Sequence, residues 1–254
     1  MFSVAALVPS PPVLVPELCG GVADAGGAGD PDPRAVLRSA VLDAVRAFAA
    51  VAQRWTVLGV GAGESTFGPE TAGTFRGFGA DVRVGLSGAA AAAAQRADAG
   101  LPLAVLIGGW LRGQVAPSAT AEARIVPADA TAEHCREAGA KLRADLDGDA
   151  APRGVLVVAD GAATLSTKAP GYLDERARPV QDRLDQALST GDRAALRALD
   201  PGLCAELSLS GRAAYQVLAG LFLADPLVET RYCAAPFGVG YHVSIWRPAE
   251  GEAP

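Results

Sequence analysis

The chain of 254 residues contains only two histidines, His134 and His242, and this small number limits the metal sites and catalytic pairs that it can form. Enzymes that hold a transition metal combine several imidazole, thiolate and carboxylate ligands, so one histidine with carboxylates would hold such a metal only weakly. A site made of carboxylates alone would prefer magnesium or calcium. His134 falls on a polar helical segment, where we expect it to be solvated. The other candidate site residues are Ser10, Glu17, Glu64, Asp160, Lys168 and Glu206.

Ser10 is the candidate nucleophile, because it lies in a proline-rich loop directly after an apolar segment. A serine nucleophile needs a neighbouring base, and the sequence supplies neither an adjacent histidine nor a GxSxG motif. A pair with His242 or with Lys168 stays open. The alternative is that Ser10 only hydrogen-bonds the backbone of its loop. The carboxylates are also open to two interpretations, as acid–base groups or as caps of helix N-termini.

The apolar segments predict the elements that must position these side chains. Phe2–Val8 is a near-continuous apolar run, typical of a strand buried on both faces of a parallel sheet, and Pro9 ends it. Further strands are predicted at Trp55–Val60, Val82–Leu86, Leu103–Ile107, Arg124–Val126, Gly154–Ala159, Leu227–Ala235 and Val239–Trp246. Helices are predicted at Pro33–Gln53 (with Asp32 as its cap), Thr131–Leu146, Asp174–Leu188, Asp192–Leu199 and Gly211–Phe222. This alternation predicts an α/β protein, in which ligands bind at the carboxyl ends of the strands.

Three glycine- or alanine-rich segments are less specific. Gly61–Ser65 reads GAGES and lacks the third glycine of a dinucleotide-binding motif. Gly108–Gly109 precedes Trp110 and Arg112, and these two side chains either line a pocket or cover an edge of the core. Gly88–Ala99 is either a helix or a loosely ordered linker.

Composition limits the class of protein. Half of the residues are hydrophobic, so a sizeable core can form, and no linker divides the chain, which predicts one domain over residues 1–254. Residues 20–31 read as a flexible connector and 248–254 as a frayed tail. A formal charge of −6 without a basic segment argues against a nucleic-acid partner. No segment resembles a membrane span or a signal peptide, and the four scattered cysteines favour reduced thiols in a cytoplasm.

Four segments in order resemble motifs of the class III extradiol ring-cleavage dioxygenases, the LigB-like superfamily. The segments are VPSPPVLVPEL at 8–18, ADGAATLSTKAPG at 159–171, the apolar helix GRAAYQVLAGLF at 211–222 and PFGVGYHVSIW at 236–246. The resemblance spans most of the chain. It implies a three-layer α/β/α fold around a mostly parallel sheet, and the tendency of relatives to form assemblies leaves a homo-oligomer open.

The residues that would hold the iron of that family are replaced in this chain. Ser10 stands where the opening loop of the family has a metal-binding histidine. Gly61 and Ala62 stand nearest to the second histidine, and Ala163 takes the place of the histidine that serves in proton transfer. Serine and alanine cannot replace neutral imidazole ligands, so we expect that the iron site is lost and that no cofactor takes its place.

Two hypotheses of function follow from this comparison. The first is a protein without dioxygenase activity that binds a small aromatic or anionic ligand in the cleft that corresponds to the active site of that family. That cleft would be lined by Ser10, Glu64, Asp160, Lys168 and His242. The second is a working enzyme with a remodelled site, either a divergent ring-cleavage dioxygenase or a metal-assisted hydrolase.

Overall fold

The computed structural model describes residues 1–20, 31–93 and 97–249. Its main sheet has seven strands in the order β3-β6-β2-β7-β1-β9-β8. These strands are β1 (Phe2–Val8), β2 (Arg54–Gly61), β3 (Ser65–Phe67), β6 (Thr120–Pro127), β7 (Arg153–Val158), β8 (Leu227–Ala234) and β9 (Tyr241–Arg247). Strands β6, β2, β7 and β1 are parallel, and β3, β9 and β8 are antiparallel to their neighbours. The predicted α/β fold with a mostly parallel central sheet is therefore confirmed.

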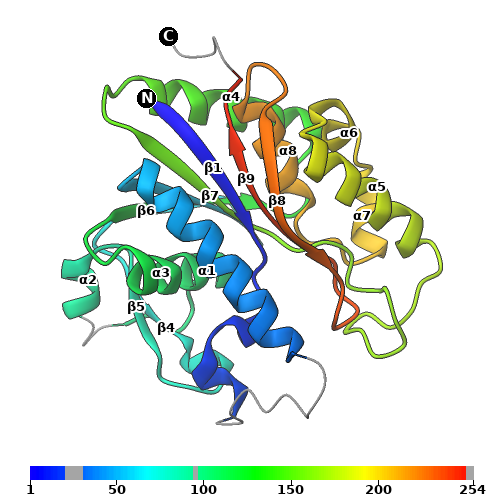
Figure 1. Cartoon of the computed structure of the whole chain (residues 1–254), viewed down its shortest axis with the longest axis horizontal. Coiled ribbons are helices and arrows are strands. Elements are labelled where there is room, and N and C mark those ends of the chain that lie inside the picture. Colours follow the sequence, from blue (N-terminus) through cyan, green and yellow to red (C-terminus); the bar gives the residue numbers. More distant parts are fainter. Residues whose placement is uncertain (21–30, 94–96, 250–254) are drawn as a thin grey trace.

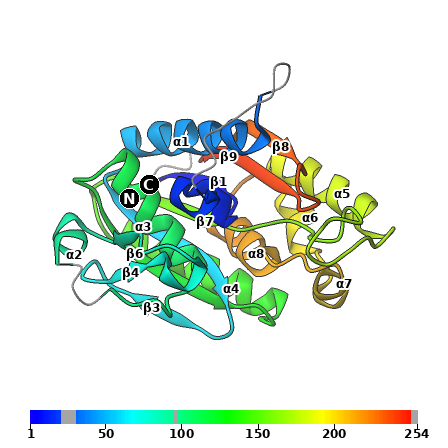
Figure 2. The same ribbon diagram turned by 90° about the horizontal axis from the view of Figure 1, so that it is seen from below.

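Helices cover both faces of this sheet and complete three layers (Figures 1 and 2). Helix α1 (Pro33–Val51) and helix α3 (Leu103–Val115) pack on one face, with Asp32 capping α1 as predicted. Helices α4 (Ala132–Asp147) and α8 (Arg212–Leu221) pack on the other face. This second layer continues with α5 (Ala177–Thr190), α6 (Arg193–Arg197) and α7 (Pro201–Glu206).

The pleat of the strands divides their side chains between the two hydrophobic cores. In β1, Val4 and Ala6 face α1, whereas Ala5 and Leu7 face the α4–α8 layer. In β9, Tyr241, Val243 and Ile245 belong to the α1 core and Trp246 to the other. Because successive side chains of a strand point to opposite faces, His242 lies on the side of the α4, α5 and α8 layer.

The predicted strand at Leu103–Ile107 is wrong, because this segment begins helix α3. Every residue from Ala104 to Arg112 is buried, so the run shows no helical periodicity and cannot be told from a buried strand by its pattern. Gly108 does not form a turn there. A Cβ on Gly108 would lie 2.6 Å from a methyl carbon of Val57, so the glycine lets α3 pack closely on β2.

Trp110 and Arg112 cover the core and do not line a pocket. They are 5% and 2% exposed, respectively. The guanidinium of Arg112 donates to the carbonyl of Gly85 at 2.8 Å and to that of Pro117 at 2.7 Å. Arg112 therefore ties α3 to the end of strand β5 (Arg83–Gly85) and to the segment that follows α3.

Several small elements lie between β3 and α3 in the chain. Strands β4 (Ala72–Thr74) and β5 (Arg83–Gly85) form a separate antiparallel pair, and β5 confirms the predicted short strand. The alanine-rich segment begins as helix α2 (Gly88–Ala92), and its residues 94–96 lie outside the described part. The predicted connector and tail fall almost entirely outside it as well, at 21–30 and 250–254.

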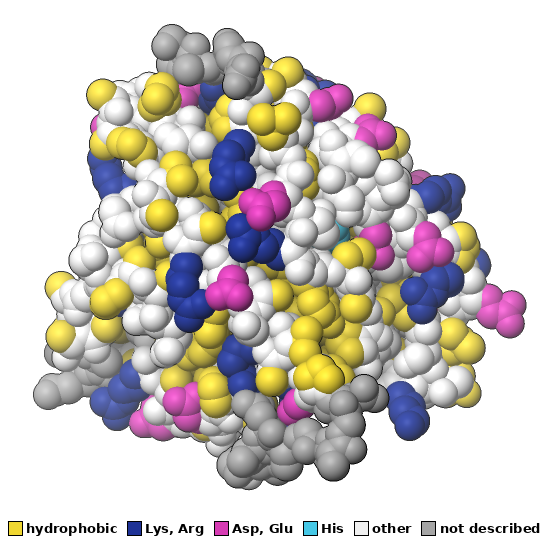
Figure 3. All heavy atoms as spheres, in the orientation of Figure 1, with side chains coloured by type: hydrophobic (Ala, Val, Ile, Leu, Met, Phe, Trp, Pro, Cys, Tyr) yellow, Lys and Arg dark blue, Asp and Glu magenta, His cyan; other side chains and the backbone are white. Residues whose placement is uncertain are grey.

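The described part of the chain has a mixed surface and free thiols. On the face drawn in Figure 3, positive and negative side chains are interspersed among hydrophobic atoms. Among the described residues, no helix has both the length and the apolar character to span a bilayer. All four cysteines lie in the described part, and none forms a disulfide.

Candidate functional site

The carboxyl ends of three neighbouring parallel strands form one edge of the sheet. Strand β7 lies between β2 and β1. Val8 of β1 pairs with Val158 of β7, so Ser10 and Asp160, two residues further along each strand, reach the same level. Leu58 of β2 pairs with Val157, which brings the residues after Gly61 to this edge too. The sheet therefore brings together the three segments at which the resemblance places its missing ligands.

Ser10 and Asp160 are in direct contact at this edge. The backbone N–H of Ser10 donates to one carboxylate oxygen of Asp160 at 2.9 Å, and its hydroxyl donates to the other. Burial raises the pKa of Asp160, and the two hydrogen bonds from Ser10 act against that rise. A carboxylate has about four acceptor positions, so Asp160 can still accept from a ligand. Ser10 is thus a partner of Asp160 with no histidine as its base.

The loop after Asp160 is bound to the loop before β9. Gly161 donates from its backbone N–H to the carbonyl of Gly240 at 2.8 Å, and Gly240 donates to Ala162 at 3.0 Å. On the other side, the N–H of Gly211 donates to the carbonyl of Asp160 at 2.9 Å. These bonds place Asp160 between β9 and the start of α8, so the segments of three sequence motifs meet at one point.

Gln181 of α5 fills the space beside these glycines. Its side-chain oxygen accepts from the N–H of Ala162 at 2.8 Å, and its amide donates to Asp185 at 2.7 Å. A Cβ on Gly240 would lie 2.3 Å from the amide carbon of Gln181, and a Cβ on Gly161 would lie 2.3 Å from its oxygen. Both positions must therefore be glycine while Gln181 keeps this position.

Two buried tyrosines, Tyr215 and Tyr241, lie near enough to Asp160 for its charge to act on them. Tyr215 is 1% exposed and Tyr241 is 4% exposed. Burial raises the pKa of both phenols, and the charge of Asp160 raises them further. The rings of Tyr241 and Phe237 meet edge to face, with centroids 6.3 Å apart. In contrast, Tyr172 is exposed.

Three of the predicted cleft residues lie elsewhere on the surface. Glu206 is exposed and pairs with Arg176 at 2.6 Å. Lys168 is exposed in its loop, where its backbone N–H donates to Ser166. Glu17 is exposed in a short 3₁₀ turn, Pro16–Cys19. The structure gives these three side chains no contact with Asp160.

Glu64 belongs to a different cavity, of about 560 Å³, between β3, β6 and α4. Its lining also includes Arg124, His134 and Lys141. His134 is exposed on α4, as the sequence predicts. This cavity carries charges of both signs, because the guanidinium of Arg124 pairs with Asp145 at 2.9 Å.

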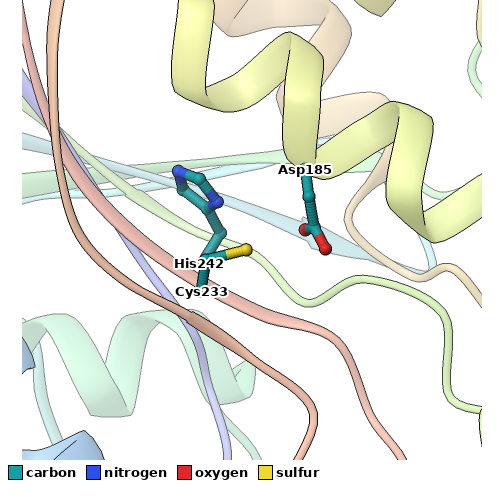
Figure 4. A group of neighbouring side chains, drawn as sticks. All are labelled: Asp185, Cys233 and His242. Carbon is teal, nitrogen blue, oxygen red and sulfur yellow. The ribbon is translucent and has the colours of Figure 1, made fainter.

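His242 is 2% exposed and lies beside Asp185 and Cys233. In the described part of the chain it forms no hydrogen bond with Ser10. Figure 4 shows the imidazole, the thiol and the carboxylate as neighbours, from β9, β8 and α5 respectively. Neither imidazole nitrogen has a hydrogen-bond partner among the described residues. Burial lowers the pKa of His242 to about 4, so the ring is neutral at neutral pH.

Sequence reasoning missed Asp185 and Cys233 as neighbours of His242. The signal was present in the hairpin, because Cys233 and His242 are equally far from its turn at Phe237–Gly238 and pair across the strands. No comparable pattern in the sequence links Asp185 to either residue.

The edge at Ser10 does not fit the iron of the resembled family. A non-haem iron site needs several histidines and a carboxylate with open positions. Here the positions hold Ser10, Gly61 or Ala62, and Ala163, whose backbone N–H donates to Leu207. Asp160 is the carboxylate that hydrogen-bonds to Ser10 in the opening loop, and it cannot form that site alone.

Comparison with known proteins gives a fold and no family. No protein-family model matches this chain, and no curated protein matches it. A crystal structure of an uncharacterized protein, JW3007 from Escherichia coli K12, is similar with a TM-score of 0.59. The similarity covers 96% of this chain and 99% of that chain at 12% sequence identity. At that identity, the likeness shows the fold alone.

Proposed function

We propose that this chain is a LigB-like protein without the iron site, and that it binds a small hydroxylated aromatic molecule at Asp160. The observation that carries the proposal is the Ser10–Asp160 pair at the carboxyl edge of β1 and β7. Open α/β sheets bind ligands at this edge. The pair also lies where two of the segments that resemble the family, 8–18 and 159–171, meet.

The chemistry of Asp160 favours one kind of ligand over another. A partly buried carboxylate repels an anion and accepts hydrogen bonds from a hydroxyl group. The sequence alone left aromatic and anionic ligands open, and the absence of a cation in contact with Asp160 among the described residues favours the first. Tyr241 is near enough to feel the charge of Asp160, and its ring meets that of Phe237, so aromatic side chains are available near the carboxylate.

Binding to three probes tests this proposal. Isothermal titration with phenol, catechol and benzoate separates a hydroxyl donor from an anion of similar size. We expect catechol to bind and benzoate not to bind. Asp160→Ala should weaken catechol binding by about tenfold or more, because a hydrogen bond to a charged group is lost.

Glu64→Gln is the matched control, because Glu64 lines the separate cavity at β3 and α4. It should leave catechol binding unchanged. Preference for benzoate, or equal binding by wild type and Asp160→Ala, would overturn the proposal. Oxygen uptake and a ring-opened product from catechol, with iron supplied, would instead support a divergent dioxygenase.

A further inference from the structure

We propose that Asp185, Cys233 and His242 form a binding site for a zinc ion. One ligand atom of each side chain lies within 4.8 Å of the other two. Figure 4 shows the three side chains as neighbours that come from α5, β8 and β9. The proposal goes beyond the ligand site at Asp160, since it concerns other residues and a different kind of ligand.

The backbone brings the three residues together for definite reasons. Cys233 and His242 are partners across the β8–β9 ladder. Directly paired residues of an antiparallel pair point to the same face of the sheet, so their side chains are neighbours. Asp185 comes from α5, and one of its carboxylate oxygens lies within 4.8 Å of the sulfur of Cys233.

His242 is the observation that points to a ligand. It is 2% exposed, and within the described part of the chain neither of its nitrogen atoms has a hydrogen-bond partner. Buried polar atoms in native proteins are nearly always paired, and each exception calls for an explanation such as an ion. A metal bound to one nitrogen of the ring would supply the missing partner.

Asp185 is oriented as metal-binding carboxylates commonly are. One of its oxygens accepts from the amide of Gln181 at 2.7 Å, which leaves the other oxygen for an ion. Groups that hydrogen-bond to a ligand fix its position and strengthen metal binding. The charge of Asp182 also acts on Asp185 and Cys233 and adds to the attraction for a cation, against the opposing charge of Arg178.

The donor set selects the metal. Imidazole nitrogen, thiolate sulfur and carboxylate oxygen together suit zinc, whereas magnesium and calcium require oxygen ligands. A tetrahedral zinc ion separates its donor atoms by about 3.5 Å, so the three side chains need to close by about 1 Å around it. Three protein ligands leave a fourth position for water. Cys233 binds as the thiolate, and its proton passes to solvent.

The thiolate of Cys233 distinguishes this site from one made of a single histidine and carboxylates. Those ligands alone hold a transition metal weakly, and the thiolate adds a stronger ligand. The expectation that no iron binds at Ser10 is unaffected, because none of the three zinc ligands belongs to the opening loop. The two sites can therefore be tested separately.

Metal titration of the full chain tests the proposal. After treatment with a chelator, the protein is titrated with zinc in competition with a chelating dye, and with cobalt under anaerobic conditions. We expect one equivalent of zinc to bind. Cobalt should give a thiolate-to-metal charge-transfer band, which reports on Cys233 directly.

Substitution of each ligand should weaken zinc binding by about tenfold or more. The variants are Asp185→Asn, Cys233→Ser and His242→Gln, and Cys233→Ser should also abolish the cobalt band. Cys233 is exposed, so its serine variant is expected to fold normally even if His242→Gln does not. The matched controls are Cys19→Ser and His134→Gln, which should bind zinc like wild type. Absence of stoichiometric binding, or equal binding by wild type and Cys233→Ser, would overturn the proposal.

Discussion

Gly240→Ala should destabilise the protein because Gln181 already occupies the space that the new methyl group needs. The added Cβ would lie 2.3 Å from the amide carbon of Gln181 and 2.5 Å from its nitrogen, about 1 Å closer than ordinary contact. Gln181 can move away only by giving up its bonds to Ala162 and Asp185. Either Gln181 stays and the loop is overpacked, or it moves and a buried hydrogen bond is lost, and each of these alternatives costs about 1–3 kcal/mol. We therefore expect Gly240→Ala to lower the free energy of unfolding by about 2 kcal/mol.

The second half of this prediction is a double-mutant cycle measured by urea denaturation. Gln181→Ala alone should cost about 1–3 kcal/mol, because the buried N–H of Ala162 loses its acceptor. In that background the clash is gone, so Gly240→Ala should then cost less than about 0.5 kcal/mol. A coupling free energy of about 1–2 kcal/mol between the two positions is the expected result.

Gly238→Ala is the matched control for the cycle. Gly238 has a φ of 73°, and its added Cβ would meet Ser166 at 2.4 Å and Ala169 at 2.6 Å. It should destabilise by a similar amount, but its effect should be additive with that of Gln181→Ala. If Gly240→Ala costs the same with and without Gln181, the reasoning about this loop is refuted.

Three further predictions concern charged groups. Asp160→Asn should be more stable than wild type at pH 8. Burial raises the pKa of Asp160 in the folded protein above its ordinary value of 3.8. Wild type therefore loses stability as the pH rises from 3.8 through the raised pKa. Melting temperatures from pH 4.5 to 8 check this, and a difference that does not grow with pH would contradict it. Arg112→Met should lower the free energy of unfolding, measured by urea denaturation, by roughly 3 kcal/mol, because buried carbonyls such as that of Gly85 lose their donor. A decrease below about 1 kcal/mol would count against this structural role. Glu206→Gln should change the free energy of unfolding by less than about 1 kcal/mol, since its ion pair with Arg176 is on the surface. It should also leave catechol binding unchanged. A tenfold loss of catechol binding would show instead that Glu206 belongs to the binding site.

Most elements of this fold follow from local patterns in the sequence. Helix α1 is indicated by Asp32, Pro33 and a regular apolar stripe, and β2 by a short, mostly apolar run. Helix α3 could not be recognised in this way. A helix that is buried all round has no polar face, so its sequence lacks the period that distinguishes a helix from a buried strand.

The sequence likewise placed some of the candidate site residues and could not place others. Ser10 and Asp160 could be brought together from the sequence, because both follow buried parallel strands and such strands end at one edge of a sheet. Glu64 also follows a strand, but the chain continues from there into β3 at the edge of the sheet, so Glu64 lies in another cavity. Asp185 could not be placed, because its position depends on how α5 packs against the β8–β9 hairpin.

Iron binding by a double variant tests most directly whether Ser10 and Ala62 occupy the positions of two lost ligands. Strands β1 and β2 flank β7, so residues that follow them are separated by roughly 10 Å, which two histidine side chains can bridge around one metal. In Ser10→His/Ala62→His, Asp160 would supply the carboxylate of a two-histidine, one-carboxylate set. Anaerobic isothermal titration with iron(II) compares this variant with wild type and with Ser10→His alone.

The double variant should bind iron(II) about tenfold or more tightly than wild type, equivalent to about 1.4 kcal/mol. Ser10→His alone should show no such gain, because the second histidine is still missing. A double variant that folds normally yet binds iron no better than wild type would contradict the proposal, since Ser10 and Ala62 would then not face one cleft.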